Sequence, residues 1–243
     1  MNNPLITFVY SYYDNPEMFY QQLCVWKSYP EKVLNQIEFI ITDDCSSKKP
    51  MCKSEFPELN IRQFRITKKV PWNWLACRNI GAKYASGKWL LLTDMDHVVQ
   101  TEHAAQLVKA LTKNKKIKTD IVYLFRRIDA PDNTPYKYHD DSFFMSKELY
   151  WKIGGYDEEL SGNYGTSGGY RRRAFSIANG NHRLKIPLTR YDRSVIADAS
   201  TTEFARKLAH NEHKHTVSDI LKRKKEEGRE KEIRVLSFPY EEI

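Results

Sequence analysis

The stretch Trp89-Leu90-Leu91-Leu92-Thr93-Asp94-Met95-Asp96 decides the fold and marks a candidate site. An apolar run of this length, followed at once by acidic residues, is typical of a buried strand whose end reaches the surface. Two carboxylates one residue apart at such an end can share a hard divalent cation, because Mg²⁺ and Mn²⁺ bind carboxylate oxygens together with substrate phosphates. We therefore predict that Asp94 and Asp96 are metal ligands, with Mn²⁺ or Mg²⁺ as the cofactor.

Strands and helices alternate on both sides of this stretch. The pattern predicts strands over residues 5–10, 39–42, 61–66, 89–93 and 120–126, helices over residues 16–28, 74–85 and 101–111, a strand and a helix within residues 143–153, and helices over 170–178 and 218–232. Such alternation indicates βαβ units and a mostly parallel central sheet flanked by helices, an α/β fold. Ligands of these sheets bind beyond the carboxyl ends of the strands, where a second acidic pair, Asp43 and Asp44, also falls.

The length of 243 residues and the hydrophobic content of 41% fit one domain with a tail. No run of about 18 apolar residues occurs, so we expect no transmembrane segment. The first residues lack a basic region followed by a long apolar segment, so we expect no secretory signal.

The cysteines indicate a reducing compartment. Cys24, Cys45, Cys52 and Cys77 lie in one third of the chain and show no Cys-x-x-Cys spacing. A cytoplasmic protein is therefore favoured over a disulfide framework or a zinc site.

The net charge of +8 favours an anionic partner, which could be a nucleotide diphosphate, a nucleic acid or an acidic membrane surface. Simple solubility is the alternative, because much of the excess falls in the run Lys222-Arg223-Lys224-Lys225.

Four ordered motifs resemble the family 2 glycosyltransferases of the GT-A, Rossmann-like fold. They are Asp43-Asp44-Cys45-Ser46, Ala76-Cys77-Arg78-Asn79-Ile80-Gly81-Ala82, the stretch from Gly87 to Asp96, and the stretch from Phe143 to Glu158, which ends in a Gly-Gly-Tyr-Asp-Glu turn. The resemblance covers about residues 5–190. It implies a catalytic domain over residues 1–205, with a nucleotide-sugar half over about 1–100 and an acceptor half over about 101–205. A charged, helical C-terminal extension over 206–243 should pack on that domain.

The resemblance also implies a donor site. Asp43 matches the aspartate that contacts the nucleotide base, and Tyr10 and Ser11 would line the same pocket. Arg78 matches a residue near the donor diphosphate. Asp94 would contact both the donor and the metal.

A histidine pair near the C-terminus could complete the metal shell. His213 and His215, with His210 nearby, resemble the pair found in the metal-dependent β-1,4-galactosyltransferase-like branch. Imidazole can serve as one ligand among oxygens. The alternative is an exposed polar cluster.

The general base of the family is missing. Inverting members place an acidic pair after the Gly-Gly-aromatic-Asp-Glu turn, but this chain has Thr166-Ser167 there. Replacement bases could be Asp140, Asp141, Asp157 or Asp192. We favour Asp140 and Asp141, which should lie at the edge of the acceptor site. A retaining mechanism, or a chain that binds without turnover, would need no such base.

The acceptor region combines small and basic residues. Gly168 and Gly169 open space, and Arg171-Arg172-Arg173 add positive charge, which would suit a phosphorylated or nucleic-acid acceptor. Trp72 and Trp74 could stack on sugars or bases.

The leading interpretation is a metal-dependent transferase, inverting in mechanism, that moves a hexose or pentose from a nucleoside-diphosphate sugar, with UDP favoured, to a saccharide hydroxyl. The alternatives are a transferase that modifies a hydroxylated base in DNA, and a nucleotide- or carbohydrate-binding protein without turnover.

Overall fold

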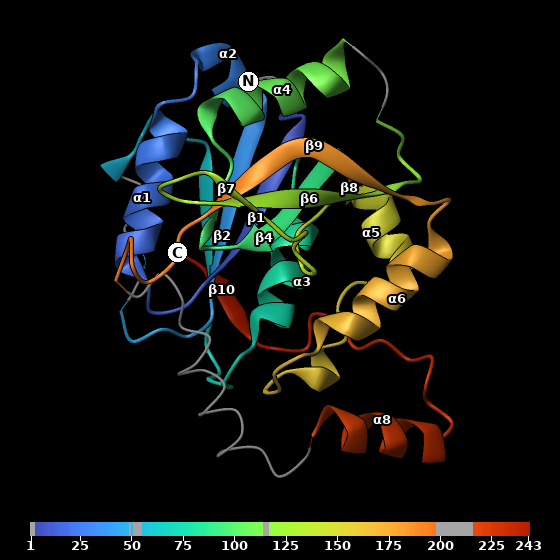
Figure 1. The fold of residues 1–243 in the computed structure, drawn as a ribbon. Helices are drawn as coiled ribbons and strands as arrows, with labels where there is room; N and C mark the ends of the chain where they lie inside the picture. Colours follow the sequence, from blue (N-terminus) through green and yellow to red (C-terminus); the bar gives the residue numbers. More distant parts are fainter. Residues whose placement is uncertain (1–2, 49, 51–54, 114–116, 198–215) are drawn as a thin grey trace.

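The computed structural model describes residues 3–48, 50, 55–113, 117–197 and 216–243 (Figure 1). Strand β1 (Ile6–Tyr12) forms the centre of a parallel group. It pairs with β2 (Ile37–Asp43) on one side and with β4 (Trp89–Asp94) on the other, and β3 (Ile61–Ile66) continues the sheet beyond β2. The predicted α/β fold with a mostly parallel central sheet is confirmed.

Five further strands extend the same ten-stranded sheet beyond β4. β8 (Phe143–Ser146) lies antiparallel to β4 and also to β6 (Val122–Asp129). β9 (Asn181–Arg190) runs parallel to β6, while the short strands β5 (His97–Val98) and β7 (Thr134–Tyr136) pair antiparallel with β9 and β6. Only β8 and β6 of this group were predicted from the sequence.

Helices cover both faces of the sheet (Figure 1). One core lies under α1 (Pro16–Lys27) and α4 (Thr101–Thr112), with the short α2 (Glu31–Leu34) at its edge. The other core lies under three helices, which are α3 (Trp74–Tyr84), α5 (Lys147–Ile153) and α6 (Ser167–Ile177). None of the helices in the described part of the chain is long and apolar enough to cross a membrane.

Two predicted helices have different bounds in the structure. α6 begins at Ser167, three residues earlier than predicted, so its first turn includes Gly168 and Gly169. α8 (Val217–Glu226) is shorter than predicted. Gly228, whose φ is 69°, adopts the left-handed conformation that commonly follows a helix end.

The C-terminal segment joins the domain at two places. The strand β10 (Tyr240–Glu242) adds antiparallel to β3 at the edge of the sheet. Upstream of it, the backbone N–H groups of Leu236 and Ser237 donate to the buried Glu158 carboxylate at 2.8 and 2.7 Å.

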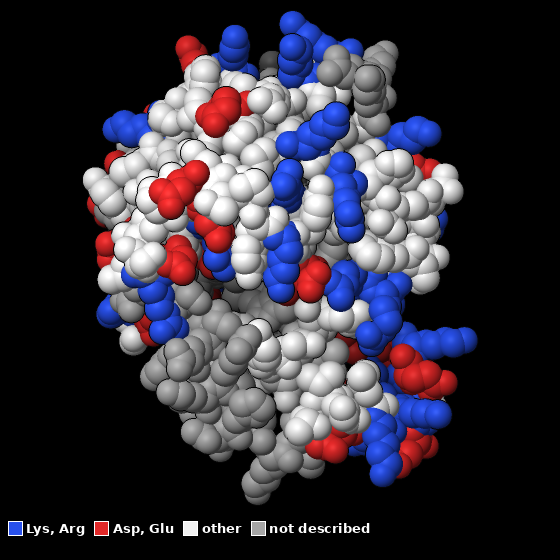
Figure 2. Space-filling view, viewed as in Figure 1, with Lys and Arg blue, Asp and Glu red and all other residues white. Residues whose placement is uncertain are grey.

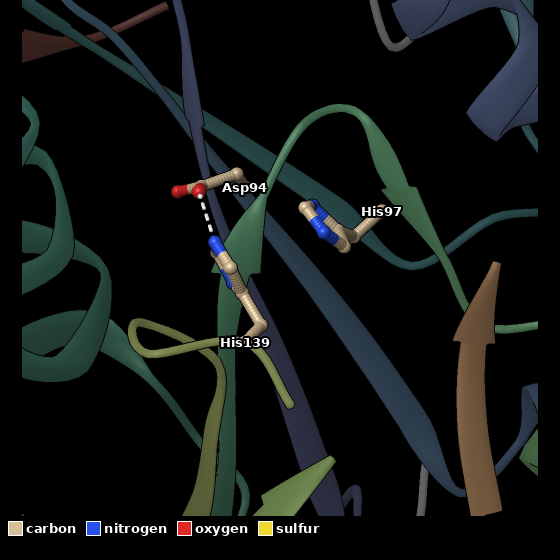
Figure 3. A group of neighbouring side chains, drawn as sticks. All are labelled: Asp94, His97 and His139. Carbon is tan, nitrogen blue, oxygen red and sulfur yellow. Dashed lines mark ion pairs between the residues drawn. The ribbon is translucent and has the colours of Figure 1, made fainter. Parts of the chain in front are cut away.

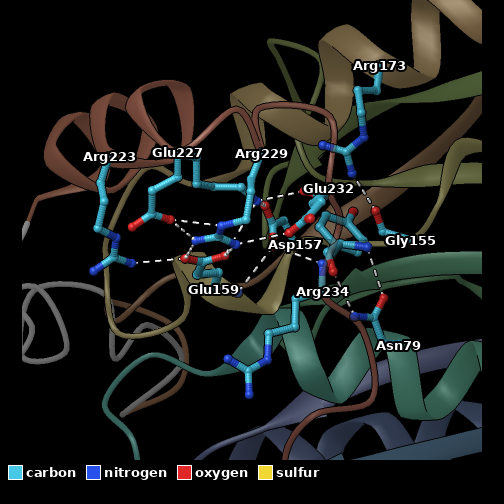
Figure 4. A network of polar contacts seen from close by, with 12 residues as sticks. Asn79, Gly155, Asp157, Glu159, Arg173, Arg223, Glu227, Arg229, Glu232 and Arg234 are labelled. Carbon is cyan, nitrogen blue, oxygen red and sulfur yellow. Dashed lines mark hydrogen bonds and ion pairs between the residues drawn. The ribbon is translucent and has the colours of Figure 1, made fainter.

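Helix α8 docks through a network of ion pairs shown in Figure 4. Lys224 Nζ lies 2.6 Å from Asp157 Oδ2, and both side chains are almost fully buried. Arg223 and Arg229 both pair with Glu159, at 2.9 and 3.3 Å. The acidic turn of the sequence motif therefore anchors the C-terminal segment.

Candidate functional site

The two acidic motifs meet at one edge of the sheet. In the parallel register, Tyr12 of β1 lies opposite Asp43 and Ser11 lies opposite Asp94. Both aspartates end their strands, so their carboxylates lie at the carboxyl edge, where α/β sheets bind ligands.

Asp94 is held from two sides and keeps an open side. Arg78 Nη2 lies 2.7 Å from Asp94 Oδ1, and His139 Nε2 lies 3.4 Å from Oδ2 (Figure 3). The Asp94 side chain is nevertheless 39% exposed. A cation could therefore reach this carboxylate from solvent.

Asp96 belongs to the turn between β4 and β5. Its Oδ1 lies 2.7 Å from Nδ1 of the buried His97, whose Nε2 lies 3.4 Å from Arg127 Nη1. His97 therefore fixes the orientation of the second carboxylate of the acidic triplet.

His139 is the site residue that the sequence did not reveal. Its ring stacks on that of His97, with centroids 4.3 Å apart and planes 22° from parallel, and its Nδ1 lies 2.7 Å from Ser142 Oγ. Burial, followed by the charge of His97, lowers the pKa of His139 well below its usual value, so the ring is neutral near pH 7. No spacing rule could have found it, because it lies in a loop 45 residues after Asp94 and meets it only through the β4–β8 pairing.

Asp94, His97 and His139 each offer a ligand atom, and these atoms lie within 4.8 Å of one another. The lone pair of an imidazole nitrogen lies in the plane of its ring. Because the His97 and His139 rings are stacked, their lone pairs lie in roughly parallel planes and do not converge on one cation. When His139 donates from Nδ1 to Ser142, its Nε2 lone pair faces the Asp94 carboxylate, and a cation between these two acceptors would satisfy both. The donor set of carboxylate oxygen with one imidazole suits Mn²⁺. His97 could join only by giving up Asp96 or Arg127. The predicted ligands His213 and His215 lie outside the described residues.

Arg78 is buried and organises the site. Its Nη1 donates to the Asp141 carbonyl at 2.7 Å and to the Tyr156 hydroxyl oxygen at 2.8 Å, while its guanidinium carbon lies 4.5 Å from the Trp74 ring centroid. Burial alone would lower the pKa of Arg78, but the nearby charges of Tyr156, Asp94 and Asp141 raise it. Arg78 therefore stays charged and joins three segments of the site.

The second acidic pair shows a division of roles. Asp43 Oδ1 accepts from Ser46 N at 2.9 Å, and its Oδ2 pairs with Arg65. Asp44 Oδ2 accepts from Asn73 N at 2.7 Å, but Asp44 Oδ1 and the Asn73 side-chain amide have no partner among the described residues. Burial raises the pKa of Asp44 well above its usual value. These buried polar atoms are candidates for a nucleotide contact, and the sequence did not indicate Asn73.

The structure corrects the assignment of Tyr10 to the pocket lining. Its side chain is fully buried beneath α1, its ring lies 5.4 Å from that of Trp26, and its hydroxyl lies 3.5 Å from the His97 carbonyl. Side chains alternate along a strand, so Tyr10 points into the core while Ser11 points to the other face. Ser11 is partly exposed, with its Oγ 3.4 Å from the Trp74 carbonyl.

Asp141 and Asp140 have different environments. Asp140 is exposed and forms an ion pair with Arg171. Asp141 lies next to Ser167 at the start of α6, and its Oδ1 has no partner among the described residues. Burial raises the pKa of Asp141 to about 6, while the positive charge of Arg78 acts in the opposite direction.

The two other candidate bases are engaged elsewhere. Asp157 is bound to Lys224 under α8. Asp192 caps a local turn by accepting from Ser194 N at 2.7 Å, and this bonding to Ser194 lowers its pKa. Of the four predicted carboxylates, only Asp141 combines proximity to Arg78 and Asp94 with an unoccupied oxygen.

Two glycines near Ser167 leave space around the start of α6. A Cβ atom built on Gly165 or Gly169 would have no neighbour within 4 Å. Trp72 contacts Tyr164, with ring centroids 5.7 Å apart. Trp74 packs on the guanidinium of Arg78.

A mostly parallel sheet with carboxylates at the ends of β2 and β4, extended by mixed strands beyond β4, is the architecture of the GT-A fold. Residues 28–177 match the model of glycosyl transferase family 2, and the chain belongs to this family. No curated protein matches the chain.

Solved structures show the same fold. A fragment of S. aureus TarS in complex with UDP is 15% identical, with a TM-score of 0.61 over 77% of this chain and 60% of that chain. GalNAc-T7 with UDP, GalNAc and Mn²⁺ is 14% identical, with a TM-score of 0.58 over 77% and 43%. The mannosyltransferase PcManGT from Pyrobaculum calidifontis, with GDP-Man and Mn²⁺, is 14% identical, with a TM-score of 0.54 over 78% and 57%. The chain therefore spans less than two thirds of the length of each of these three structures.

Proposed function

We propose that the protein is a metal-dependent, inverting glycosyltransferase that moves a sugar from a UDP-sugar to a saccharide hydroxyl. The observation that carries the proposal is Asp94 at the end of β4, held between Arg78 and His139 with an exposed side. The presence of UDP or Mn²⁺ in the neighbouring TarS, GalNAc-T7 and PcManGT structures supports the choice of nucleotide and metal.

The donor half, over about residues 1–100, would bind the nucleotide at the β2 edge. Asp43 is pre-oriented by Arg65 and Ser46, and Asp44 with Asn73 brings unpaired polar atoms to the same place. A bound divalent cation would neutralise charge on the departing diphosphate. Asp94, Asp96 and His139 are its proposed protein ligands, and Arg78 orients Asp94.

The acceptor half, over about residues 101–205, would supply the base. Asp141 takes the proton of the acceptor hydroxyl while the hydroxyl oxygen forms a bond to the anomeric carbon of the donor sugar. The bond from that carbon to the diphosphate oxygen breaks, and nucleoside diphosphate leaves. Attack opposite to the leaving group inverts the anomeric configuration, which is why this mechanism needs a base on the acceptor side.

The location of the protein is also part of the proposal. The described cysteines Cys24, Cys45 and Cys77 are free thiols, which supports a cytoplasmic protein.

A panel of UDP-, GDP- and TDP-sugars with Mn²⁺ tests the function. The matching donor at about 100 times its dissociation constant should stabilise the fold by about 2.7 kcal/mol. Nucleoside diphosphate should be released only when an acceptor saccharide is added. Stabilisation without turnover on any acceptor would favour a binding protein, and no stabilisation by any donor would overturn the proposal.

A further inference from the structure

Four exposed basic side chains lie on the outer strands and on α6. They are Arg126 of β6, Arg183 and Lys185 of β9, and Arg172 of α6, and we call them the basic band. Figure 2 shows blue side chains running from the region of β6 and β9 toward α6. No acidic residue in the described part of the chain pairs with any of the four. The band therefore carries uncompensated positive charge.

Strand pairing brings the three band residues of the sheet to one side. Leu124 of β6 packs against the core under α3, α5 and α6, so Arg126, two residues farther, points the same way. Arg183 lies opposite Leu124 in the parallel register. The register shifts between Leu184 and Pro187, but Leu184 and Ile186 on either side of Lys185 both pack against the core under α1 and α4, so Lys185 points to the opposite side, as Arg183 does. All three side chains therefore project to the side of the sheet that α6 covers.

Arg172 extends the band toward Asp141. On α6, a Cβ built on Gly168 would lie 3.6 Å from Arg172 Nη1, so this guanidinium lies over the first turn of the helix. The first residue of that turn is Ser167, which neighbours Asp141. Asp140, which directly precedes Asp141, is already paired with Arg171.

We propose that the basic band binds phosphate groups of the acceptor, so that the acceptor is a phosphate-bearing saccharide. The inference rests on the proposed transferase function and adds the class of its acceptor. The donor diphosphate does not account for the band, because the donor is assigned to the β2 and β4 strand ends. Guanidinium and ammonium groups form strong charge-assisted hydrogen bonds with phosphate oxygens, and a one-sign patch beside a cleft concentrates anionic substrates.

The tyrosines near the band argue against a nucleic acid. Single-stranded nucleic acids bind through base stacking on open aromatic faces. The guanidinium of Arg183 lies 4.6 Å from the centre of the Tyr138 ring. The guanidinium groups of Arg127 and Arg190 lie 4.6 and 4.5 Å from the centre of the Tyr136 ring. These groups occupy the ring faces on which bases would have to stack.

Titration with a phosphomannan and with the same polymer after removal of its phosphates tests the inference. We expect at least about tenfold tighter binding of the phosphorylated polymer at low salt, with an affinity that falls steeply as salt rises. The double variant Arg183→Gln/Lys185→Gln, and separately Arg126→Gln, should remove most of this difference. The matched control Lys222→Gln/Lys225→Gln removes two charges from α8 and should retain it.

Parallel measurement of UDP and Mn²⁺ stabilisation separates this inference from the function on which it rests. If both polymers bind equally while UDP binding is intact, the proposal that the basic band binds phosphate is wrong and the proposed transferase function stands. If phosphomannan binds but no nucleotide-sugar donor does, the proposed transferase function is wrong. If a thymidine oligonucleotide binds more tightly than phosphomannan through the same arginines, a nucleic-acid acceptor replaces the saccharide and the inference is wrong.

Discussion

At the scale of single residues, the site depends on side chains that restrain one another. Arg78 holds Asp94, His97 holds Asp96, and His139 closes the second side of Asp94. The acidic triplet alone indicated a metal, but the partners come from a distant helix and from a loop. Their convergence is a property of the fold.

Asp141 is predicted to be the base, and Asp141→Asn tests it. Because an amide cannot take a proton, transfer should fall by about 10²- to 10⁴-fold while UDP binding is preserved. Asp140→Asn is the matched control: Asp140 is exposed and already paired with Arg171, so its loss should change turnover little. Near-normal turnover in Asp141→Asn, or a product that keeps the anomeric configuration of the donor, would show that this assignment is wrong.

His139 is predicted to be a metal ligand, and His139→Ala should weaken Mn²⁺-assisted UDP binding by about 10- to 100-fold, a loss typical of damaged metal sites. Binding of UDP in EDTA should not change. His103→Gln on α4, remote from Asp94, is the control. If Mn²⁺ tightens UDP binding as much in His139→Ala as in the parent, His139 is not a metal ligand, and Asp94 and Asp96 remain as the proposed ligands.

At the scale of elements, two helical glycines have opposite roles. A Cβ on Gly81 of α3 would lie 2.3 Å from Val9 Cγ1, so this glycine allows the helix to approach β1, whereas Gly169 of α6 faces open space. Gly81→Ala should lower the free energy of unfolding by about 1–3 kcal/mol through overpacking. Gly169→Ala should raise it by about 0.5–1 kcal/mol, since alanine is the better helix former. Urea unfolding of both variants measures the difference, and equal effects would contradict the packing described for α3.

The elements also show which parts of the fold could be predicted. β1, β2 and β4 are apolar runs buried on both faces, and these were found. β9 was missed because Asn181, Arg183 and Lys185 are exposed at its outer end, so it lacks an apolar run. β10 is short and exposed, and its pairing with β3 depends on contacts far along the chain. In the same way, Asp94 could be found from its position after a strand, whereas His139 could not.

At the scale of the whole molecule, the buried carboxylate of Glu158 connects the C-terminal segment to α3. Glu158 accepts from Asn79 Nδ2 at 2.7 Å as well as from the backbone of Leu236 and Ser237. Asn79 directly follows Arg78 on α3, so the anchor of the C-terminal segment and the proposed donor site share one helix turn.

Glu158→Ala should therefore destabilise the whole molecule. It leaves several buried donors without an acceptor, and we expect a loss of about 2–4 kcal/mol in the free energy of unfolding. Glu226→Gln, an exposed change on α8, should stay within about 0.5 kcal/mol of the parent. Earlier proteolysis of the segment after residue 216 in Glu158→Ala would support the same anchoring role. Two variants of equal stability would contradict it.

The central claim is that Asp94, at the end of β4, holds a divalent cation for the diphosphate of a nucleotide-sugar donor. Calorimetric titration of UDP into the protein, with MnCl₂ and with EDTA, tests it most directly when the parent is compared with Asp94→Asn. We predict that Mn²⁺ tightens UDP binding at least about tenfold in the parent, because the metal bridges carboxylate and phosphate, and that Asp94→Asn loses this gain. Equal UDP affinity in Mn²⁺ and EDTA for the parent, or a full Mn²⁺ effect in Asp94→Asn, would contradict the claim.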